Sequence, residues 1–195
     1  MGKQSYLLGM IFFVGAGTLP WGESLAGAAD DKLPRGVAII QGCGDKEIAG
    51  TAVLHELPSD EGIKLVKVEM MVYGLSDGKH AVHIHETGTC EPCSAAKGHY
   101  DPGPFGKTTP DAPDFNHPFH MGDLINIEVN NGLGIMKTVT NRVTLSPGRL
   151  SIFDEDGSAF IIHTQEDTYC DHENELNKGC AGGDRDACGL IRSIQ

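Results

Sequence analysis

The 195-residue chain predicts an all-β domain, either a sandwich or a barrel, from three features of its sequence. Short runs rich in β-branched residues recur along it, and turn-forming segments such as Ser76-Asp77-Gly78 and Asn130-Asn131-Gly132 separate them. No helical period of useful length accompanies these runs. Short strands at regular spacing between turns are typical of all-β sandwiches and barrels.

Eight runs are expected to form the strands of this domain. They are residues 37–41, 49–57, 63–73, 79–86, 124–129, 142–145, 158–164 and 190–194. Two long irregular segments, residues 87–120 and 165–188, interrupt the series. Because long loops in a compact domain are usually functional, we expect the site to be built on these two loops.

The first residues are expected to be a secretory signal peptide. Lys3 supplies its positive end, and residues 6–14 form an apolar stretch that is too short to span a bilayer as a helix. Ala26-Gly27-Ala28 fits a cleavage site, which assigns residues 1–28 to the signal and residues 29–195 to one mature domain. A retained membrane anchor is the alternative. We therefore expect a periplasmic or secreted protein that has no membrane contact after signal removal.

Charge and cysteine content narrow the class of protein. The formal net charge is −12, so no nucleic-acid partner is expected, and an anionic substrate would need local positive charge. Six cysteines in an exported chain predict disulfides rather than thiolate metal ligands. Cys170 and Cys180 flank one loop and form an obvious local pair, but the sequence does not fix how they pair with Cys43 and Cys93.

Histidines carry the strongest functional signal. His83 and His85 are two residues apart in an expected strand, so they point to the same face and can hold one metal ion. Imidazole suits copper and zinc. Together with His99, His163 and the nearby charge of Arg185, the pair suggests a metal that acts on a small anion.

His80 is interpreted differently from the two histidines that follow it. Its parity in the strand is that of Val82 and Ile84, which are expected to face the core. We therefore predict that His80 is a structural histidine, hydrogen-bonded at the edge of the core.

The chain resembles the copper,zinc superoxide dismutases of bacterial type over roughly residues 37–191. The matching motifs occur in the order of the family: His83-Ile84-His85 with Glu86, Cys90, Gly98-His99-Tyr100-Asp101-Pro102, His120-Met121-Gly122-Asp123-Leu124, His163 with Asp167, and Arg185-Asp186-Ala187-Cys188-Gly189-Leu190-Ile191. The resemblance implies an eight-stranded Greek-key β-barrel or sandwich of immunoglobulin-like type with two long functional loops. It also implies that superoxide is the substrate, which copper converts to dioxygen and hydrogen peroxide by cycling between Cu(II) and Cu(I).

The resemblance implies a role for each member of a copper site. The implied copper ligands are His83, His85, His99 and His163. His99 would bridge copper and zinc, and it would act as a general acid towards peroxide. Arg185 would be catalytic as the guide for the anion, because a guanidinium forks to two oxygens. The other interpretation is that Arg185 braces its loop through hydrogen bonds to backbone carbonyls. The two roles are compatible.

The resemblance also implies two supporting features. Asp167 matches a carboxylate that orients one copper histidine, which by position is His83, and one zinc histidine. Cys90 is expected to pair with Cys188, tying the first long loop to the last strand.

The zinc ligands depart from the pattern of the family. The resemblance supplies His99, His120 and Asp123, but Thr108 stands where the family usually has another histidine. Zinc prefers nitrogen, thiolate or carboxylate ligands, so a threonine hydroxyl is a poor replacement. We predict that His117 is the fourth ligand and the zinc-side partner of Asp167. The alternative is that His117 is a solvated loop histidine and that zinc binds weakly or not at all.

The leading functional interpretation is an exported superoxide dismutase with copper and zinc as cofactors. Two alternatives stay open: a dismutase-like module that buffers or delivers copper with little turnover, and a copper-only dismutase without zinc. The sequence is compatible with a monomer and with a homodimer.

Overall fold

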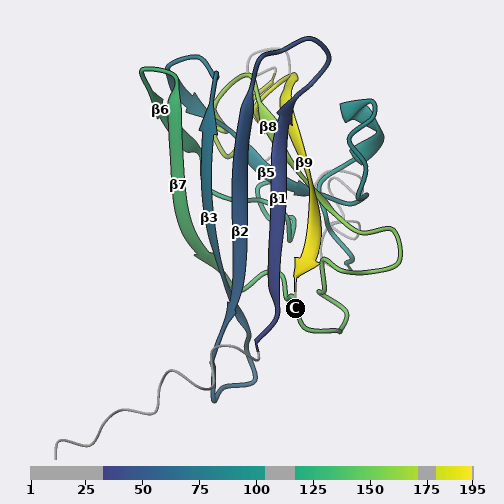
Figure 1. Cartoon of the computed structure of the whole chain (residues 1–195). Coiled ribbons are helices and arrows are strands. Elements are labelled where there is room, and N and C mark those ends of the chain that lie inside the picture. The colour runs from purple at the N-terminus through teal and green to yellow at the C-terminus, as the bar shows by residue number, and fades with distance from the viewer. Residues whose placement is uncertain (1–32, 104–116, 171–178, 195) are drawn as a thin grey trace, which may run out of the picture.

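The computed structural model describes residues 33–103, 117–170 and 179–194. In these ranges the chain forms nine strands and one short 3-10 helix, and no helix there is long and apolar enough to cross a membrane (Figure 1). The elements are β1 (Arg35–Gly42), β2 (Ala49–Leu57), β3 (Leu65–Tyr73), β4 (Gly78–His80), β5 (Val82–His85), η1 (Cys93–Ala96), β6 (Ile127–Asn130), β7 (Leu133–Thr140), β8 (Ala159–His163) and β9 (Arg185–Ile194).

The strands form one antiparallel sheet that closes nearly into a barrel. Their order is β4-β6-β7-β3-β2-β1-β9-β8-β5, and every hydrogen-bonded pair of strands is antiparallel. The first and last strands in this order, β4 and β5, are separated in sequence only by Ala81, so the sheet returns to its starting point. Figure 1 shows β7, β3, β2 and β1 as one broad face, with β5 and β8 behind it.

Alternation of side chains along the strands builds the core. In β3 the buried residues are Val66, Val68, Met70 and Val72, while their neighbours along the strand point outward. Strands β5 and β8 differ, because every one of their residues is buried. One face of each strand lines the core and the long loops cover the other face. This second, covered face is where the functional histidines lie.

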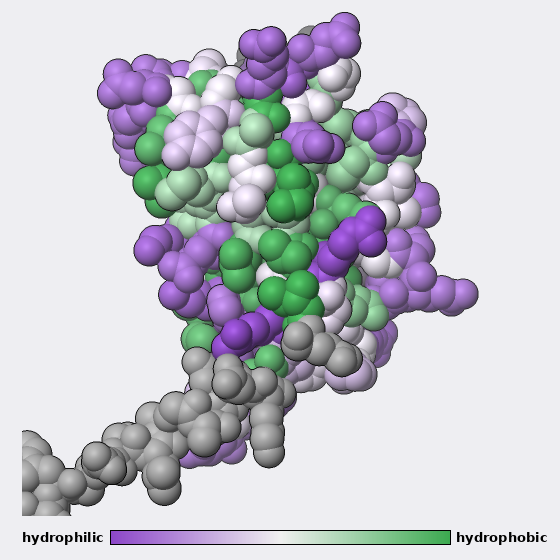
Figure 2. All heavy atoms as spheres, viewed as in Figure 1, coloured by the Kyte–Doolittle hydropathy of each residue, from purple (hydrophilic) through white to green (hydrophobic). Residues whose placement is uncertain are grey.

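The broad face carries apolar side chains on its outer surface. Figure 2 shows them gathered over the middle of that face. Ile39, Met71 and Ile135 are exposed on this face, and Met71 pairs directly with Ile135 across β3 and β7. This surface lies on strands other than β5 and β8, which carry the functional histidines.

The all-β fold is confirmed, but the strand count differs from the eight expected. The expected strand 79–86 is broken at Ala81, whose N–H donates to the Gln165 carbonyl and whose carbonyl accepts from the His163 N–H. These bonds to a loop and to the end of β8 replace the contacts of a continuous strand. The result is the separate strands β4 and β5.

The expected strand at residues 142–145 was wrong, and one strand of the structure was not predicted. Residues 142–145 form only one isolated bridge, between Thr144 and Ser151. The chain instead uses β7, which lies directly after the Asn131-Gly132 turn and was not predicted. Its inward position Gly134 packs against the side chains of Ile127 and Val129, so the strand lacks the apolar alternation that sequence patterns detect.

A buried carboxylate fastens the segment after β7 to β2. Glu56 is 1% exposed, and it accepts hydrogen bonds from the Leu145 N–H at 2.9 Å, the Ser146 N–H at 2.8 Å and the Ser146 hydroxyl at 2.5 Å. Burial alone would raise the pKa of Glu56, but the bonds from Ser146 and Leu145, with Lys64 nearby, outweigh it and lower the pKa. The carboxylate form is therefore the one that stabilises the fold.

Replacing Glu56 by glutamine should lower the free energy of unfolding at neutral pH by about 1–3 kcal/mol, because charged hydrogen bonds to two N–H groups and a hydroxyl are weakened. Because the pKa of Glu56 is lower in the folded state, its carboxylate stabilises the fold at pH values above 4.5, the ordinary pKa of the group. This stabilisation is lost as the pH falls through the lowered pKa. Urea unfolding of both metal-free proteins at neutral and acid pH measures this effect. A difference that does not narrow in acid would contradict the explanation.

Candidate metal centre

Backbone contacts bring two parts of the chain between η1 and β6 against β5. Isolated bridges pair His85 with His99 and His83 with Asp123. Gly122 allows this close approach, because a Cβ atom there would lie 2.2 Å from the Ile84 carbonyl oxygen. Its carbonyl also accepts from the Ile84 N–H at 2.9 Å. These two parts of the chain therefore present His99 and Asp123 next to the strand that carries the His-x-His pair.

Four imidazoles converge at this face. One ring nitrogen from each of His83, His85, His99 and His163 can be chosen so that all lie within 4.8 Å of one another. His83, His85 and His163 are buried, and His99 is partly buried. This group has no carboxylate or thiolate member. An all-imidazole site of this kind suits copper.

The ring contacts of His83 and His163 indicate a cation between them. The far nitrogen of His83, Nε2, bonds Asp167 at 2.8 Å, and the far nitrogen of His163, Nδ1, bonds the Gly183 carbonyl at 2.9 Å. Both partners are acceptors, so each far nitrogen carries the hydrogen. The facing nitrogens, 3.2 Å apart, therefore present lone pairs to each other. Burial lowers the pKa of His83 to about 3 and that of His163 to about 4, so protonation at neutral pH does not relieve this repulsion.

His85 shows the same pattern with a single nitrogen. Its Nδ1 donates to the Lys97 carbonyl at 2.9 Å, which leaves a lone pair on Nε2. That Nε2 atom is buried and has no hydrogen-bond partner in the structure. A buried acceptor without a donor is costly, and a metal ion would satisfy it. The residues present therefore fit a copper ion.

A second group of donors surrounds Asp123. The Nδ1 atom of His99 lies 2.7 Å from Oδ1, and the Nδ1 atoms of His120 and His117 lie 3.1 and 3.3 Å from Oδ2. Three imidazole nitrogens and one carboxylate form a donor set that zinc commonly uses. His99 belongs to both groups, so the two sites share one ring. Ligand atoms of His83, His99, His117 and Asp123 also lie within 4.8 Å of one another, and His120 is not part of that set.

His117 is buried, with 2% of its surface exposed, which rules out the solvated loop histidine of the alternative interpretation. Burial alone would lower the pKa of His117. Hydrogen bonds to Asp123 and Asp167 outweigh burial and raise the pKa to about 9. The site thus favours a positive charge at this ring, which a metal ion can supply in place of the proton.

Asp167 connects the two groups. Its Oδ2 accepts from His83 Nε2 at 2.8 Å and its Oδ1 accepts from His117 Nε2 at 2.8 Å, so the structure places both expected partners at this carboxylate. Asn126 in turn fixes the backbone of Asp167, accepting from its N–H at 2.8 Å and donating to its carbonyl at 2.9 Å. Sequence reasoning missed Asn126, because a lone asparagine near a histidine motif carries no pattern of its own.

Arg185, the first residue of β9, lies beside the all-imidazole group. Its Nη1 donates to the Cys93 carbonyl at 2.6 Å, and its Nη2 donates to the Lys97 carbonyl. The Lys97 carbonyl also accepts from His85, so the guanidinium and a histidine of the group share one acceptor. Arg185 thus braces the first long loop and holds its charge next to the four imidazoles. These two backbone acceptors could not be read from side-chain patterns.

Three disulfides join the described cysteines. They are Cys43–Cys93, Cys90–Cys188 and Cys170–Cys180, with Cα–Cα distances of 5.8, 5.7 and 6.1 Å. The structure thus contains the Cys90–Cys188 bond that the resemblance implied, and the local pair in the second long loop. It also resolves the pairing of Cys43 and Cys93 that the sequence left open.

One remaining prediction is confirmed, and two concern residues that the structure does not describe. His80 is buried and bonds the His163 carbonyl at 2.7 Å and the Ser76 carbonyl at 2.9 Å, so its structural role is confirmed. Thr108 and the signal segment 1–28 lie outside the described residues.

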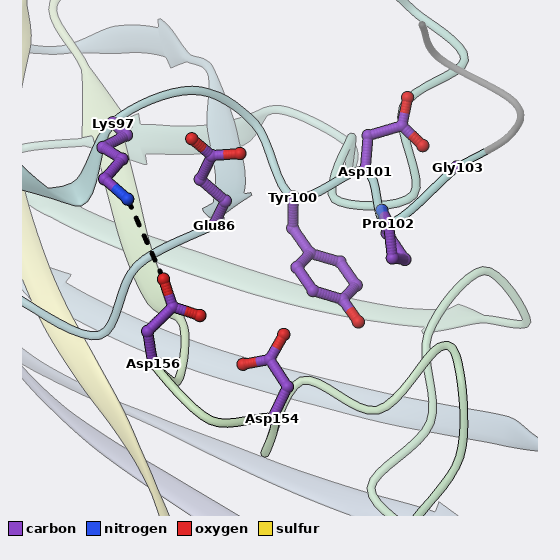
Figure 3. A pocket seen from close by; sticks show the side chains of 8 residues that line it. All are labelled: Glu86, Lys97, Tyr100, Asp101, Pro102, Gly103, Asp154 and Asp156. Carbon is purple, nitrogen blue, oxygen red and sulfur yellow. Dashed lines mark ion pairs between the residues drawn. The ribbon is translucent and has the colours of Figure 1, made fainter.

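Two hollows lie near the metal centre. A cavity of about 610 Å³ borders His99 and His163 and gives access to the all-imidazole group. A second hollow, shown in Figure 3, is lined by four carboxylates and Lys97, which lies 3.8 Å from Asp156. Its carboxylates do not form a metal-binding group among the described residues. Its acidic lining also disfavours an anion.

A nearly closed antiparallel barrel with an all-imidazole site beside an imidazole–carboxylate site defines a copper and zinc metalloprotein. Comparison with known families agrees: the model for copper/zinc superoxide dismutase (SODC) matches residues 48–191. The chain belongs to the copper/zinc superoxide dismutase family. Superoxide dismutation, an oxidoreductase activity, and the cofactors copper and zinc follow from this membership.

Similar proteins come from animals and bacteria. The extracellular superoxide dismutase [Cu-Zn] of Drosophila melanogaster is 36% identical over 129 residues, which cover 65% of this chain and 67% of that protein. Superoxide dismutase [Cu-Zn] 2 of Salmonella typhimurium is 31% identical over 176 residues, covering 86% and 91%. Among solved structures, the clock protein EA4 matches with a TM-score of 0.61 and 26% identity, over 80% of this chain and 92% of that one.

Proposed function

We propose that the protein is an exported superoxide dismutase that holds one copper ion and one zinc ion per chain. The copper ligands are the four converging imidazoles, His83, His85, His99 and His163. The zinc ligands are Asp123 and the three imidazoles that surround it, those of His99, His117 and His120. The observation that carries this proposal is the pair of facing lone pairs on His83 and His163, which call for a cation.

Bound copper supplies one-electron chemistry, by which one superoxide is oxidised to dioxygen and a second is reduced to peroxide with uptake of two protons. The protein supplies the positions of the proton and the anion. His99 keeps its Nδ1 towards Asp123, so its other ring nitrogen is the one available to the all-imidazole group. A proton held on that nitrogen can be passed to peroxide, which is general acid catalysis.

Arg185 is proposed to attract and orient superoxide. The whole chain carries a charge of −12, so at long range it repels an anion, and a fixed local cation is needed to overcome this. The carbonyls of Cys93 and Lys97 hold the guanidinium next to His85. A guanidinium held in this way can fork its N–H groups to the two oxygens of a diatomic anion.

Replacing Arg185 by alanine should lower the rate constant for superoxide about ten-fold or more, equivalent to at least about 1.4 kcal/mol of barrier, with copper still bound. Pulse radiolysis with metal analysis measures both quantities. Arg185→Lys is the matched control, because it keeps the charge and loses the fork, so it should retain part of the rate. An unchanged rate in Arg185→Ala would limit this residue to bracing the loop.

Export is supported by the three disulfides, which form in oxidising compartments, and by relatives that include extracellular enzymes. We propose that residues 1–28 are a signal peptide, that residues 29–195 are the mature enzyme and that the compartment is the periplasm. N-terminal sequencing of the mature protein tests the boundary before Ala29.

A further inference from the structure

The turn between β1 and β2, residues 43–48, lies against the start of β9 and forms hydrogen bonds with its backbone. The Cys43 N–H donates to the Asp186 carbonyl at 2.8 Å. Lys46 Nζ lies 2.5 Å from Asp186 Oδ1 and donates to the Arg185 carbonyl at 3.2 Å. The main chain at Arg185 is therefore held from the side of the turn.

The same turn is bonded covalently to the segment that holds the guanidinium. Cys43 forms a disulfide with Cys93, the first residue of η1. The Cys93 carbonyl accepts the 2.6 Å hydrogen bond from Arg185 Nη1. One turn thus holds both ends of Arg185. Lys46 bonds its backbone carbonyl, with the Cys43 N–H bonding the carbonyl of the next residue, and the disulfide holds the Cys93 carbonyl that accepts from the guanidinium.

The Cys90–Cys188 bond does not replace this connection. It joins the same loop to β9 at Cys90, which lies before η1. The two acceptors of the guanidinium lie further along the chain, because Cys93 is the first residue of η1 and Lys97 directly follows it. The Thr87 N–H to Ala96 carbonyl bond, at 3.3 Å, also attaches η1 to the loop itself rather than to the barrel. The Cys43–Cys93 bond is the direct covalent connection between the first acceptor and the turn that follows β1.

We propose that the Cys43–Cys93 disulfide is a positioning element for Arg185, which sets the direction of the guanidinium towards the bound anion. This inference rests on the proposed role of Arg185. A guanidinium whose acceptor carbonyl can shift spends less time in the orientation that meets the substrate. Small errors in the placement of a binding group carry large losses in rate, even when the change lies outside the reacting atoms.

The test is a double-mutant cycle on the metal-loaded enzyme. Cys43→Ser/Cys93→Ser is made with Arg185 intact and in the Arg185→Ala background. The rate constant for superoxide and the affinity of the copper enzyme for azide, a small anion followed by optical titration, are measured in all four proteins. With Arg185 intact, removing the disulfide should lower both about three- to ten-fold with normal metal content. In the Arg185→Ala background, removing the disulfide should change the rate constant and the azide affinity by no more than about 1.5-fold each.

Three outcomes separate the possibilities. Equal losses in both backgrounds would show that the disulfide acts through general stability, and would overturn the proposal. If removing the disulfide with Arg185 intact lowers neither the rate constant nor the azide affinity, the proposal is also overturned. In that case a low rate in the Arg185→Ala enzyme would still support the proposed function. An unchanged rate in Arg185→Ala would remove the proposed role of the arginine and the inference with it.

Two controls protect this test. Glu56→Gln weakens the fold away from Arg185, so it should leave the rate and the azide affinity unchanged. If the double-serine enzyme does not fold, Cys43→Val/Cys93→Ala refills part of the lost volume and is carried through the same cycle. Coupling to Arg185 is again expected, and its absence there would overturn the proposal.

Discussion

His163→Ala should reduce the dismutase rate by at least about 100-fold, because it removes one of four converging imidazoles and the lone pair that faces His83. Loss of a residue that merely supports a metal ligand commonly costs 10–100-fold in affinity or activity, so loss of a ligand itself should cost at least the upper end of that range. Copper removal from the unmodified protein should abolish the activity, and copper addition should restore it. Superoxide assays with metal analysis on purified protein measure both effects.

His55→Ala is the matched control for this variant. His55 lies on β2, outside both groups of metal-binding residues, so its loss should leave the rate unchanged. A copper-free preparation that still dismutes superoxide at full rate would contradict the copper assignment. Full copper occupancy with little turnover in the unmodified protein would instead favour a module that buffers or delivers copper.

His117→Ala should lose zinc while copper stays near full occupancy, and the unmodified protein should bind about one zinc per chain. His117 is buried between Asp123 and Asp167, whereas its ring is not among the four that converge on the copper position. Removing it would leave zinc with three protein ligands, which is an open site rather than a closed structural one. Metal analysis after dialysis against a weak chelator measures the two occupancies separately.

His117→Cys provides the control, because a thiolate is a good zinc ligand and should restore part of the zinc affinity. Tight zinc binding by the unmodified protein together with equally tight binding by His117→Ala would exclude the fourth ligand. An unmodified protein that dismutes superoxide without zinc would favour the copper-only alternative.

Most of the strands and the pairing of donors on β5 could be predicted from the sequence. Period-two alternation alone places His83 and His85 on one face and Val82 and Ile84 on the other, as the structure shows. Strand β7 was missed because its inward position Gly134 breaks the apolar pattern. The split at Ala81 was missed because its hydrogen bonds come from distant segments.

The candidate site was predictable only where side chains carry the chemistry. Spacing alone could not decide between a buried and a solvated His117, because its burial depends on how a long loop folds over β5 and on a carboxylate fifty residues away in sequence. The carbonyls of Cys93 and Lys97, which hold Arg185, are backbone atoms that every residue possesses. Such contacts leave no trace in residue identity.

Closure of the sheet at Ala81 also affects how chains meet one another. The two edge strands, β4 and β5, are only three and four residues long, and all of β5 is buried beneath the loops. Unpaired N–H and C=O groups on a long, open edge are templates for strand addition by a neighbouring molecule. Across the described ranges, this sheet offers no such edge. The loops that carry the histidines and Asp123 thereby also cap the barrel against edge-to-edge aggregation.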